Sequence, residues 1–80
     1  MTEAQAIEIA KKRRKEIGID PEMRVSSAEK AIVEYKKDPD EPGPAEDRVA
    51  WIVEFSCEWG YAVVHVEDKT GEILTVKGSA

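Results

Sequence analysis

The chain carries three consecutive stretches of alternating apolar and polar residues between Val49 and Val76, separated by two short turns. An alternation with a period of two is typical of strands that bury one face. The turns are Trp59-Gly60 and Asp68-Lys69-Thr70-Gly71, and in each of them a glycine can adopt the positive φ that a tight hairpin needs. The pattern therefore predicts an antiparallel meander.

The registers of this meander can be inferred because apolar residues must lie beside apolar residues on the buried face. Pairing Cys57 with Ala62 satisfies this condition in the first hairpin, and pairing Asp68 with Glu72 satisfies it in the second. The predicted core face consists of Trp51, Val53, Phe55, Cys57, Ala62, Val64, Val66, Leu74 and Val76.

A helix is expected before the sheet, from about Glu3 to Ile17. Thr2 and Gln5 have the spacing of a capping box, Gly18 is a natural residue to follow a helix, and Pro21 prevents its resumption. Its apolar residues lie at helical spacings and would cover one face of the sheet. These residues are Ala6, Ile7, Ala10 and Ile17.

The segment from Met23 to Lys36 is compatible with two structures. As a helix it would be capped by Ser26 and Glu29. As a strand it would place its alternate residues Met23, Val25, Ala31, Val33 and Tyr35 on one buried face. We favour a long strand, bulged near Ser27 to Glu29. The expected fold class is thus α+β, with one N-terminal helix packed on a three- to four-stranded antiparallel meander sheet.

Length and charge restrict the classes of function. Eighty residues are expected to form a single domain, 1–80, that buries about 60% of its unfolded surface. A mobile acidic, proline-rich loop is expected at about 37–48, since Asp38 to Asp47 contains three prolines and five acidic residues. The net charge of −5 argues against nucleic acid and anionic lipid as partners, and no apolar stretch is long enough for membrane insertion.

The sequence contains few side chains that are candidates for catalysis or metal binding. The only histidine, His65, and the only cysteine, Cys57, are predicted on opposite faces of the sheet, with His65 across from Glu54, so the two cannot form a nucleophile and base. A structural zinc site needs four ligands, usually Cys or His, which this chain does not have. We therefore predict no catalytic residues, no metal site and no cofactor, and a protein that is not an enzyme.

The pattern resembles the PepSY domain, a small module of bacterial peptidase propeptides and envelope proteins. The residues that carry the resemblance are Ala6-Ile7-x-Ile9-Ala10, Trp51-x-Val53-x-Phe55 and Val64-x-Val66-Glu67-Asp68-Lys69-Thr70-Gly71-Glu72-Ile73-Leu74. The family often has aspartate directly after the second valine, where this chain has Glu67. The resemblance implies a cystatin-like α+β fold, a binding or inhibitory role, no catalytic residues, and a bacterial envelope or secreted location, with a cytoplasmic location left open.

Recognition of another protein is the remaining class of function. The sheet face opposite the helix is predicted to display Ile52, Tyr61, Val63 and Ile73, while Trp59 either folds back onto the core edge or anchors a partner. These five residues form the predicted partner-binding site. The partner would be peptidase-like, or a second copy of the chain. A weaker resemblance to bacterial toxin-immunity proteins offers an alternative, in which the acidic loop and sheet mask a basic toxin surface.

Overall fold

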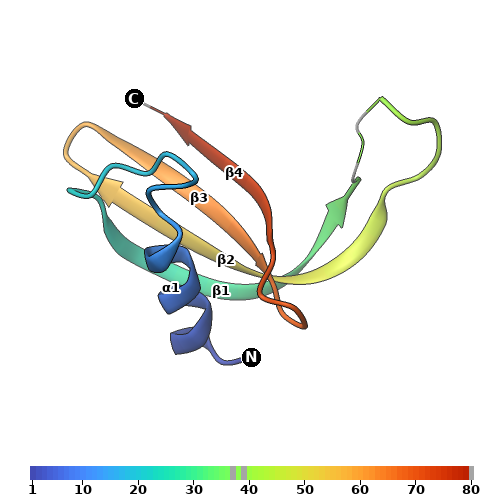
Figure 1. The fold of residues 1–80 in the computed structure, drawn as a ribbon, viewed down its shortest axis with the longest axis horizontal. Coiled ribbons are helices and arrows are strands. Elements are labelled where there is room, and N and C mark those ends of the chain that lie inside the picture. Colours follow the sequence, from blue (N-terminus) through green and yellow to red (C-terminus); the bar gives the residue numbers. More distant parts are fainter. Residues whose placement is uncertain (37, 39, 80) are drawn as a thin grey trace.

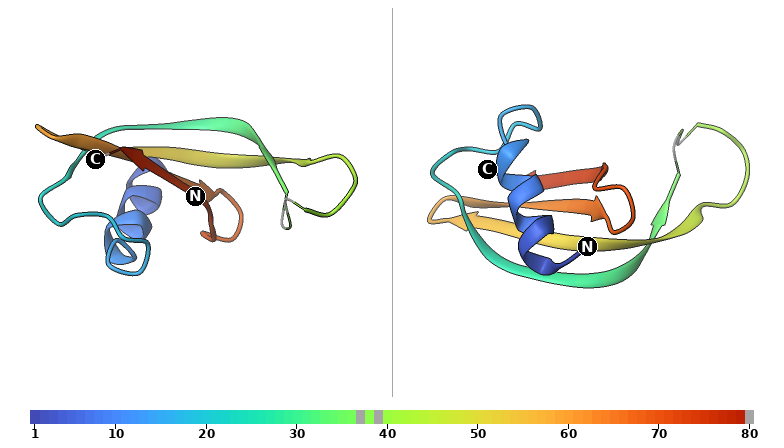
Figure 2. Two further views of the ribbon diagram at one scale, coloured as in Figure 1. Left: turned by 90° about the horizontal axis from the view of Figure 1, so that it is seen from above. Right: turned by 60° about the horizontal axis from the view of Figure 1, so that its bottom comes forward.

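The structure, a computed structural model, describes residues 1–36, 38 and 40–79, of which Ser79 is described for its backbone alone. One helix packs on a four-stranded antiparallel sheet of strand order β1-β2-β3-β4 (Figure 1), which confirms the predicted α+β class. The elements are α1 (Glu3–Lys12), β1 (Arg24–Tyr35), β2 (Glu46–Cys57), β3 (Gly60–Glu67) and β4 (Ile73–Ser79). In Figure 2, α1 crosses a single face of the sheet, which leaves the other face open.

The helix begins where the capping box predicts and ends earlier than expected. The Thr2 amide donates to Gln5 Oε1 at 2.8 Å, and the Gln5 amide donates to Thr2 Oγ1 at 3.2 Å. α1 stops at Lys12, because the basic run that follows has no apolar side chain to bury against the sheet. The chain turns instead, and the Arg14 guanidinium donates to the carbonyl of Pro21 at 3.3 Å.

The core lies between α1 and the helix-side face of the sheet. Small alanines on α1 allow the helix backbone to approach the strands closely, and Phe55 is the largest side chain that is fully buried. The segment that follows α1 adds Met23, which was expected on a buried face, and Ile19, which was not assigned to the core. The buried cluster is Ala6, Ala10, Ile19, Met23, Val53, Phe55, Ala62, Val64 and Val66, with Trp51, Cys57 and Ile73 partly buried against it.

The β2–β3 hairpin has the predicted faces but a different register. Phe55 pairs with Ala62 and Cys57 pairs with Gly60, a shift of two residues from the predicted pairing of Cys57 with Ala62. The predicted positive φ at Gly60 is wrong as well, because Gly60 is the first residue of β3 and the turn consists of Glu58 and Trp59. A shift of two preserves which side chains face inward. It leaves Cys57 at the end of its strand and only half-buried.

The β3–β4 hairpin turns at Gly71, whose φ of +75° confirms the predicted left-handed glycine. Val76 pairs with Val64 as expected, but its predicted burial is wrong, since it is 39% exposed where α1 does not cover β4 to the same extent. The pairing then shifts by one residue, so that Ile73 rather than Leu74 lies beside Val66. The predicted inward position of Leu74 and the predicted open-face position of Ile73 are therefore wrong, because Leu74 is the extra residue of a β-bulge.

The segment from Met23 to Lys36 is a strand, and its bulge lies at Ser26, just before the predicted position. A bulge exchanges the faces of all residues that follow it. Ala28 consequently packs on the core, whereas Ala31 pairs with Ala50 and points to the open face. The predicted burial of Ala31, Val33 and Tyr35 on the same face as Val25 is wrong for this reason.

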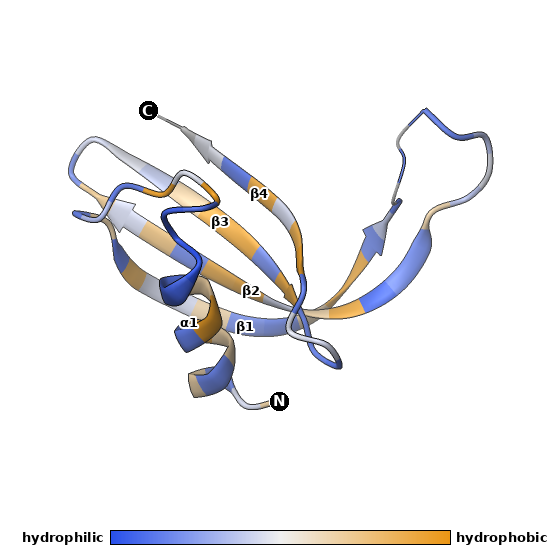
Figure 3. Cartoon of the chain, viewed as in Figure 1, coloured by the Kyte–Doolittle hydropathy of each residue, from blue (hydrophilic) through white to orange (hydrophobic). Residues whose placement is uncertain are grey.

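β1 and β2 continue beyond the end of β3 as a two-stranded arm (Figure 1). The arm consists of residues 32–35 paired with residues 46–49. Ile32 and Val49 pair across it with exposures of 71% and 41%. The described part of the connection, residues 38 and 40–45, is mostly hydrophilic (Figure 3), and Lys37 and Pro39 lie outside the described residues. The predicted end of this loop at about residue 48 is too late, because β2 already begins at Glu46. Within the described residues, no helix is long and apolar enough to cross a membrane.

Candidate binding surface

Two of the five predicted partner-binding residues flank a groove at one end of the molecule. Trp59 in the β2–β3 turn and Tyr61 at the start of β3 are each 49% exposed. The groove beside them has a volume of about 480 Å³. We call it the β4 groove, and its lining is Ile17, Gly18, Ile19, Asp20, Met23, Trp59, Tyr61, Ala62, Val76, Lys77 and Gly78.

The β4 groove exists because α1 packs on β1, β2 and β3 and not to the same extent on β4. Ile19 and Met23 belong to the buried core and also line the groove, so its floor is continuous with the core. Val76 on β4 is 39% exposed beside them. A Cβ at Gly78 would lie 3.1 Å from the Tyr61 carbonyl oxygen, so a larger residue would crowd the β3–β4 pairing there.

The open face holds two more of the predicted residues. Ile52 on β2 and Val63 on β3 are half-buried and lie diagonally across the two strands, since Ile52 pairs with His65 and Val63 pairs with Glu54. Tyr61 shares the parity of Val63 and connects this face to the β4 groove. Ile52, Val63 and Tyr61 thus share the open face, Trp59 lies beside Tyr61 at the groove, and Ile73 is separated from them on the opposite face.

His65 also lies on the open face, opposite Ile52 rather than opposite Glu54 as predicted. Its other neighbour is Thr75 on β4. Partial burial lowers the pKa of His65, and the positive charge of Lys77 lowers it further. Both effects disfavour the imidazolium form relative to the neutral imidazole.

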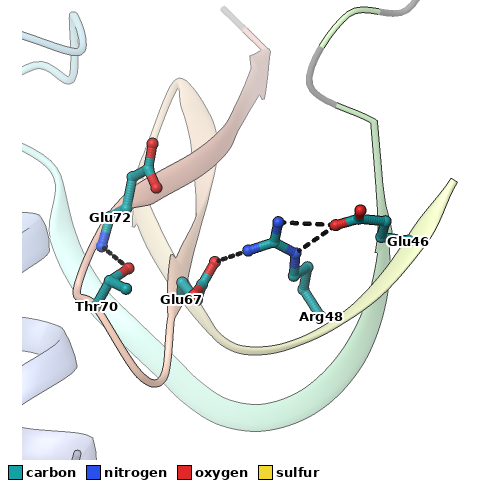
Figure 4. Close-up of polar contacts among 5 residues, drawn as sticks. All are labelled: Glu46, Arg48, Glu67, Thr70 and Glu72. Carbon is teal, nitrogen blue, oxygen red and sulfur yellow. Dashed lines mark hydrogen bonds and ion pairs between the residues drawn. The ribbon is translucent and has the colours of Figure 1, made fainter.

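Arg48 connects the arm to the end of β3 (Figure 4). Its Nη1 donates to Glu67 Oε2 at 2.7 Å and its Nη2 donates to Glu46 Oε2 at 2.8 Å. The guanidinium also lies 5.7 Å from the centre of the Tyr35 ring. The hydrogen bonds to Glu46 and Glu67 raise the pKa of Arg48. Glu67, at the position where the resembling family often has aspartate, is 6% exposed and its charge is compensated by Arg48.

Asp68 forms a second polar cluster, on the helix side of the sheet. The Trp51 indole Nε1 donates to Asp68 Oδ1 at 2.8 Å, and Lys30 Nζ lies 3.7 Å from Oδ2. The hydrogen bond from Trp51 is the main cause that lowers the pKa of Asp68, and Lys30 adds to it. The N-terminal ammonium of Met1 is a third partner, 3.5 Å from Oδ1. The cluster therefore fixes the β3–β4 turn against β1, β2 and the start of the chain.

Cys57 and His65 lie on opposite faces of the sheet, as predicted, and the described residues include no cluster of metal-ligating side chains. No group of three or more histidine, cysteine, aspartate or glutamate side chains among them is placed to hold a metal ion. Cys57 Sγ contacts the Gly60 carbonyl oxygen at 3.6 Å, while His65 points to the other face of the sheet. These two side chains are therefore not placed to act together as a nucleophile and a base.

A single helix on one face of a four-stranded antiparallel meander defines a small α+β module. The chain matches the family model of PepSY, the peptidase propeptide and YPEB domain, over residues 1–77, and it belongs to this family. The resemblance inferred from the sequence is confirmed. PepSY domains are propeptide-like or regulatory modules, not catalytic in themselves, and they interact with peptidases or other proteins. No curated protein and no solved structure gives a significant match.

Proposed function

We propose that the chain is a non-enzymatic module that binds another protein and inhibits or regulates it. The partner contacts Trp59, Tyr61 and the β4 groove. The observation that carries this proposal is the pairing of two half-exposed aromatic side chains with a groove floored by core residues. Tryptophan and tyrosine dominate binding energy at protein interfaces, and an apolar pocket beside them provides the desolvated centre that such interfaces need.

The open-face residues extend this surface. Tyr61 leads from the groove to Val63 and Ile52, which are half-buried in the sheet and add apolar area around the aromatic pair. Ile73 has no part in the proposed surface because it packs on the core. The family supports a protein partner, since PepSY domains interact with peptidases or other proteins.

The proposal is tested by photo-crosslinking with the aromatic pair left intact. A photoreactive amino acid replaces the exposed Glu58 beside Trp59, and a matched version carries it at Glu41 in the connection at the end of the arm. We expect position 58, and not position 41, to capture one specific protein in an extract of the native host. Addition of the purified chain then changes the activity of that protein.

Competition gives the control. Excess unlabelled chain should abolish the crosslink, and the double variant Trp59→Ala/Tyr61→Ala should fail to compete. The matched double variant Ile32→Ala/Val49→Ala removes two exposed apolar side chains from the arm and should compete like the parent. Equal competition by both double variants would overturn the assignment of the surface.

The alternative function as a toxin-immunity protein is favoured by one observation. Five exposed acidic residues gather on the arm and its connection, namely Asp38, Asp40, Glu41, Glu46 and Asp47. Such a cluster is complementary to a basic protein surface. Capture of a basic protein from position 41 instead of position 58 would support this alternative.

A further inference from the structure

We infer that the partner contributes an extended segment, which pairs with the free edge of β4 and inserts alternate side chains into the β4 groove. This inference rests on the proposed function as a protein-binding module. It specifies the recognition mode as strand addition, in which main-chain hydrogen bonds supply affinity and pockets for alternate side chains supply specificity.

β4 is the last strand of the sheet and pairs with β3 alone among the described residues. Its outer edge therefore presents backbone N–H and C=O groups that another strand can pair with. The other edge strand, β1, is longer and has four charged side chains, which are Arg24, Glu29, Lys30 and Glu34. Charged side chains protect an edge against pairing, and β4 has only one, Lys77.

The groove lies where the side chains of an added strand would go. Strands in a sheet lie about 4.8 Å apart, and successive side chains point to opposite faces. A strand added outside β4 therefore places every second side chain on the helix side, next to Val76 and above Ile19 and Met23. Apolar side chains of the added strand are favoured at these positions, because core residues form the bottom of the groove.

Charge determines what the intervening residues should be. Lys77 pairs with Val63 and so points to the open face, where it also depresses the pKa of His65. Opposite charges in cross-strand positions are favourable, so the residue beside Lys77 should be acidic. The occupant is thus an extended segment in which apolar residues alternate with polar ones and an acidic residue faces Lys77. A second copy of β4 brings another lysine and no acidic residue.

The test uses a defined probe and the full chain. The probe is an acetylated and amidated heptapeptide in which valine alternates with threonine and the central polar residue is glutamate. Titration into the ¹⁵N-labelled chain should shift the amide signals of β4 and the groove and slow hydrogen exchange in β4. A peptide with the same side chains, but methylated at alternate backbone nitrogens, should not bind because it lacks donors for the pairing.

A charge swap tests the register. Lys77→Glu should weaken binding of the glutamate probe by roughly threefold to tenfold and strengthen binding of the same peptide with a central lysine. Lys11→Glu makes the same charge change at an exposed position on α1 and should leave the preference unchanged. Both variants alter exposed side chains and should keep the parent melting temperature.

Three results would overturn the inference. These are equal binding of the plain and the N-methylated peptide, signal changes confined to β1, and a concentration-dependent dimer in sedimentation that the probe does not disperse. Two further outcomes distinguish a failure of strand addition from a failure of the proposed function. If position 58 still captures its specific partner while the probe fails, the module binds protein and strand addition is wrong. If position 58 captures nothing while the probe binds β4 as described, the edge is recognised and the proposed function is wrong.

Discussion

Both ends of the β1–β2 ribbon place apolar residues on the side that faces the helix, but these residues differ in burial. At the helix-covered end Phe55 is fully buried, whereas in the arm Ile32 remains 71% exposed although it points to the same side of the ribbon. The difference arises because β3 and α1 cover only the first end. An isolated two-stranded ribbon has too little apolar contact to be stable alone. An apolar residue on one face of a two-stranded ribbon is therefore buried only where a third strand and a helix are also present.

The largest expected effect is at Phe55. Phe55→Ala removes the largest fully buried side chain and should lower the free energy of unfolding by about 3–5 kcal/mol. Ile32→Ala on the same face of the arm should change it by less than about 0.5 kcal/mol. Chemical denaturation measures both. Similar losses for the two variants would mean that the arm is packed in solution and would remove the contrast between the two ends.

Substitutions at two glycines test the same difference in packing between the helix-covered end and the arm. Gly71 has φ +75° and an added Cβ would lie 3.0 Å from Ile9 Cδ1, so Gly71→Ala should cost about 1–3 kcal/mol. Gly43, in the connection at the end of the arm, has φ +132° and nothing within 4 Å of an added Cβ. Gly43→Ala should cost less, because its surroundings can relax without moving the core. Thermal unfolding of the two variants provides the comparison, and a larger loss at Gly43 would contradict it.

The arm should depend on Arg48 more than the core does. Arg48→Ala leaves the buried Glu67 carboxylate without its partner at 2.7 Å and removes the contact with Tyr35. We expect severalfold faster amide exchange at residues 32–34 and 47–49 and little change at Val53 and Val64. Arg48→Lys, which keeps the charge, should recover part of the protection. Uniform acceleration over the whole sheet would show that Arg48 stabilises both regions alike.

The smallest effect concerns pH and His65. Burial and Lys77 lower its pKa from 6.5 in the folded state, so the unfolded chain binds more protons as the pH falls. The stability contributed by neutral His65 is present above pH 6.5 and is lost as the pH falls through the lower folded value. The parent should lose about one to two degrees more in melting temperature between pH 7.5 and 5.5 than His65→Gln. An equal loss in both proteins would assign the pH dependence to other groups.

Local signals in the sequence were sufficient for the elements and for most of the faces. Thr2 and Gln5 fixed the start of α1, and the parity of Val53, Phe55 and Val64 identified the buried side of the meander. These inferences succeeded because each depends on residues within one turn or one hairpin. The register error in the β2–β3 hairpin did not alter the faces, since it was a shift of two residues.

The features that sequence reasoning missed depend on distant contacts. Ile73 and Leu74 are both apolar, so their order does not reveal which one lies beside Val66, and the bulge that decides this has no local signature. Arg48 and Glu67 are 19 residues apart, and nothing around either indicates the other. The β4 groove could not be predicted from the sequence, because it depends on how far α1 extends over the sheet. The exposed aromatic pair beside it, Trp59 and Tyr61, was the one sequence signal that pointed there.

The bulge at Ser26 has a consequence for changes in the length of the gene. Loss of the Ser26 codon would remove the extra residue of the bulge and leave Val25 and Ala28 two positions apart, so both would still face the core. Loss of the Glu29 codon, in the regular part of β1, would instead make every later residue of the strand change sides. In the second case Val33 and Tyr35 would turn toward the helix side, and Tyr35 would leave Arg48. A codon gained between Gly43 and Ala45 alters only a connection outside the strands. Length changes should therefore be tolerated near residue 43 and a deletion should be tolerated at residue 26, whereas a single deletion at residue 29 should be selected against, although all three positions are exposed.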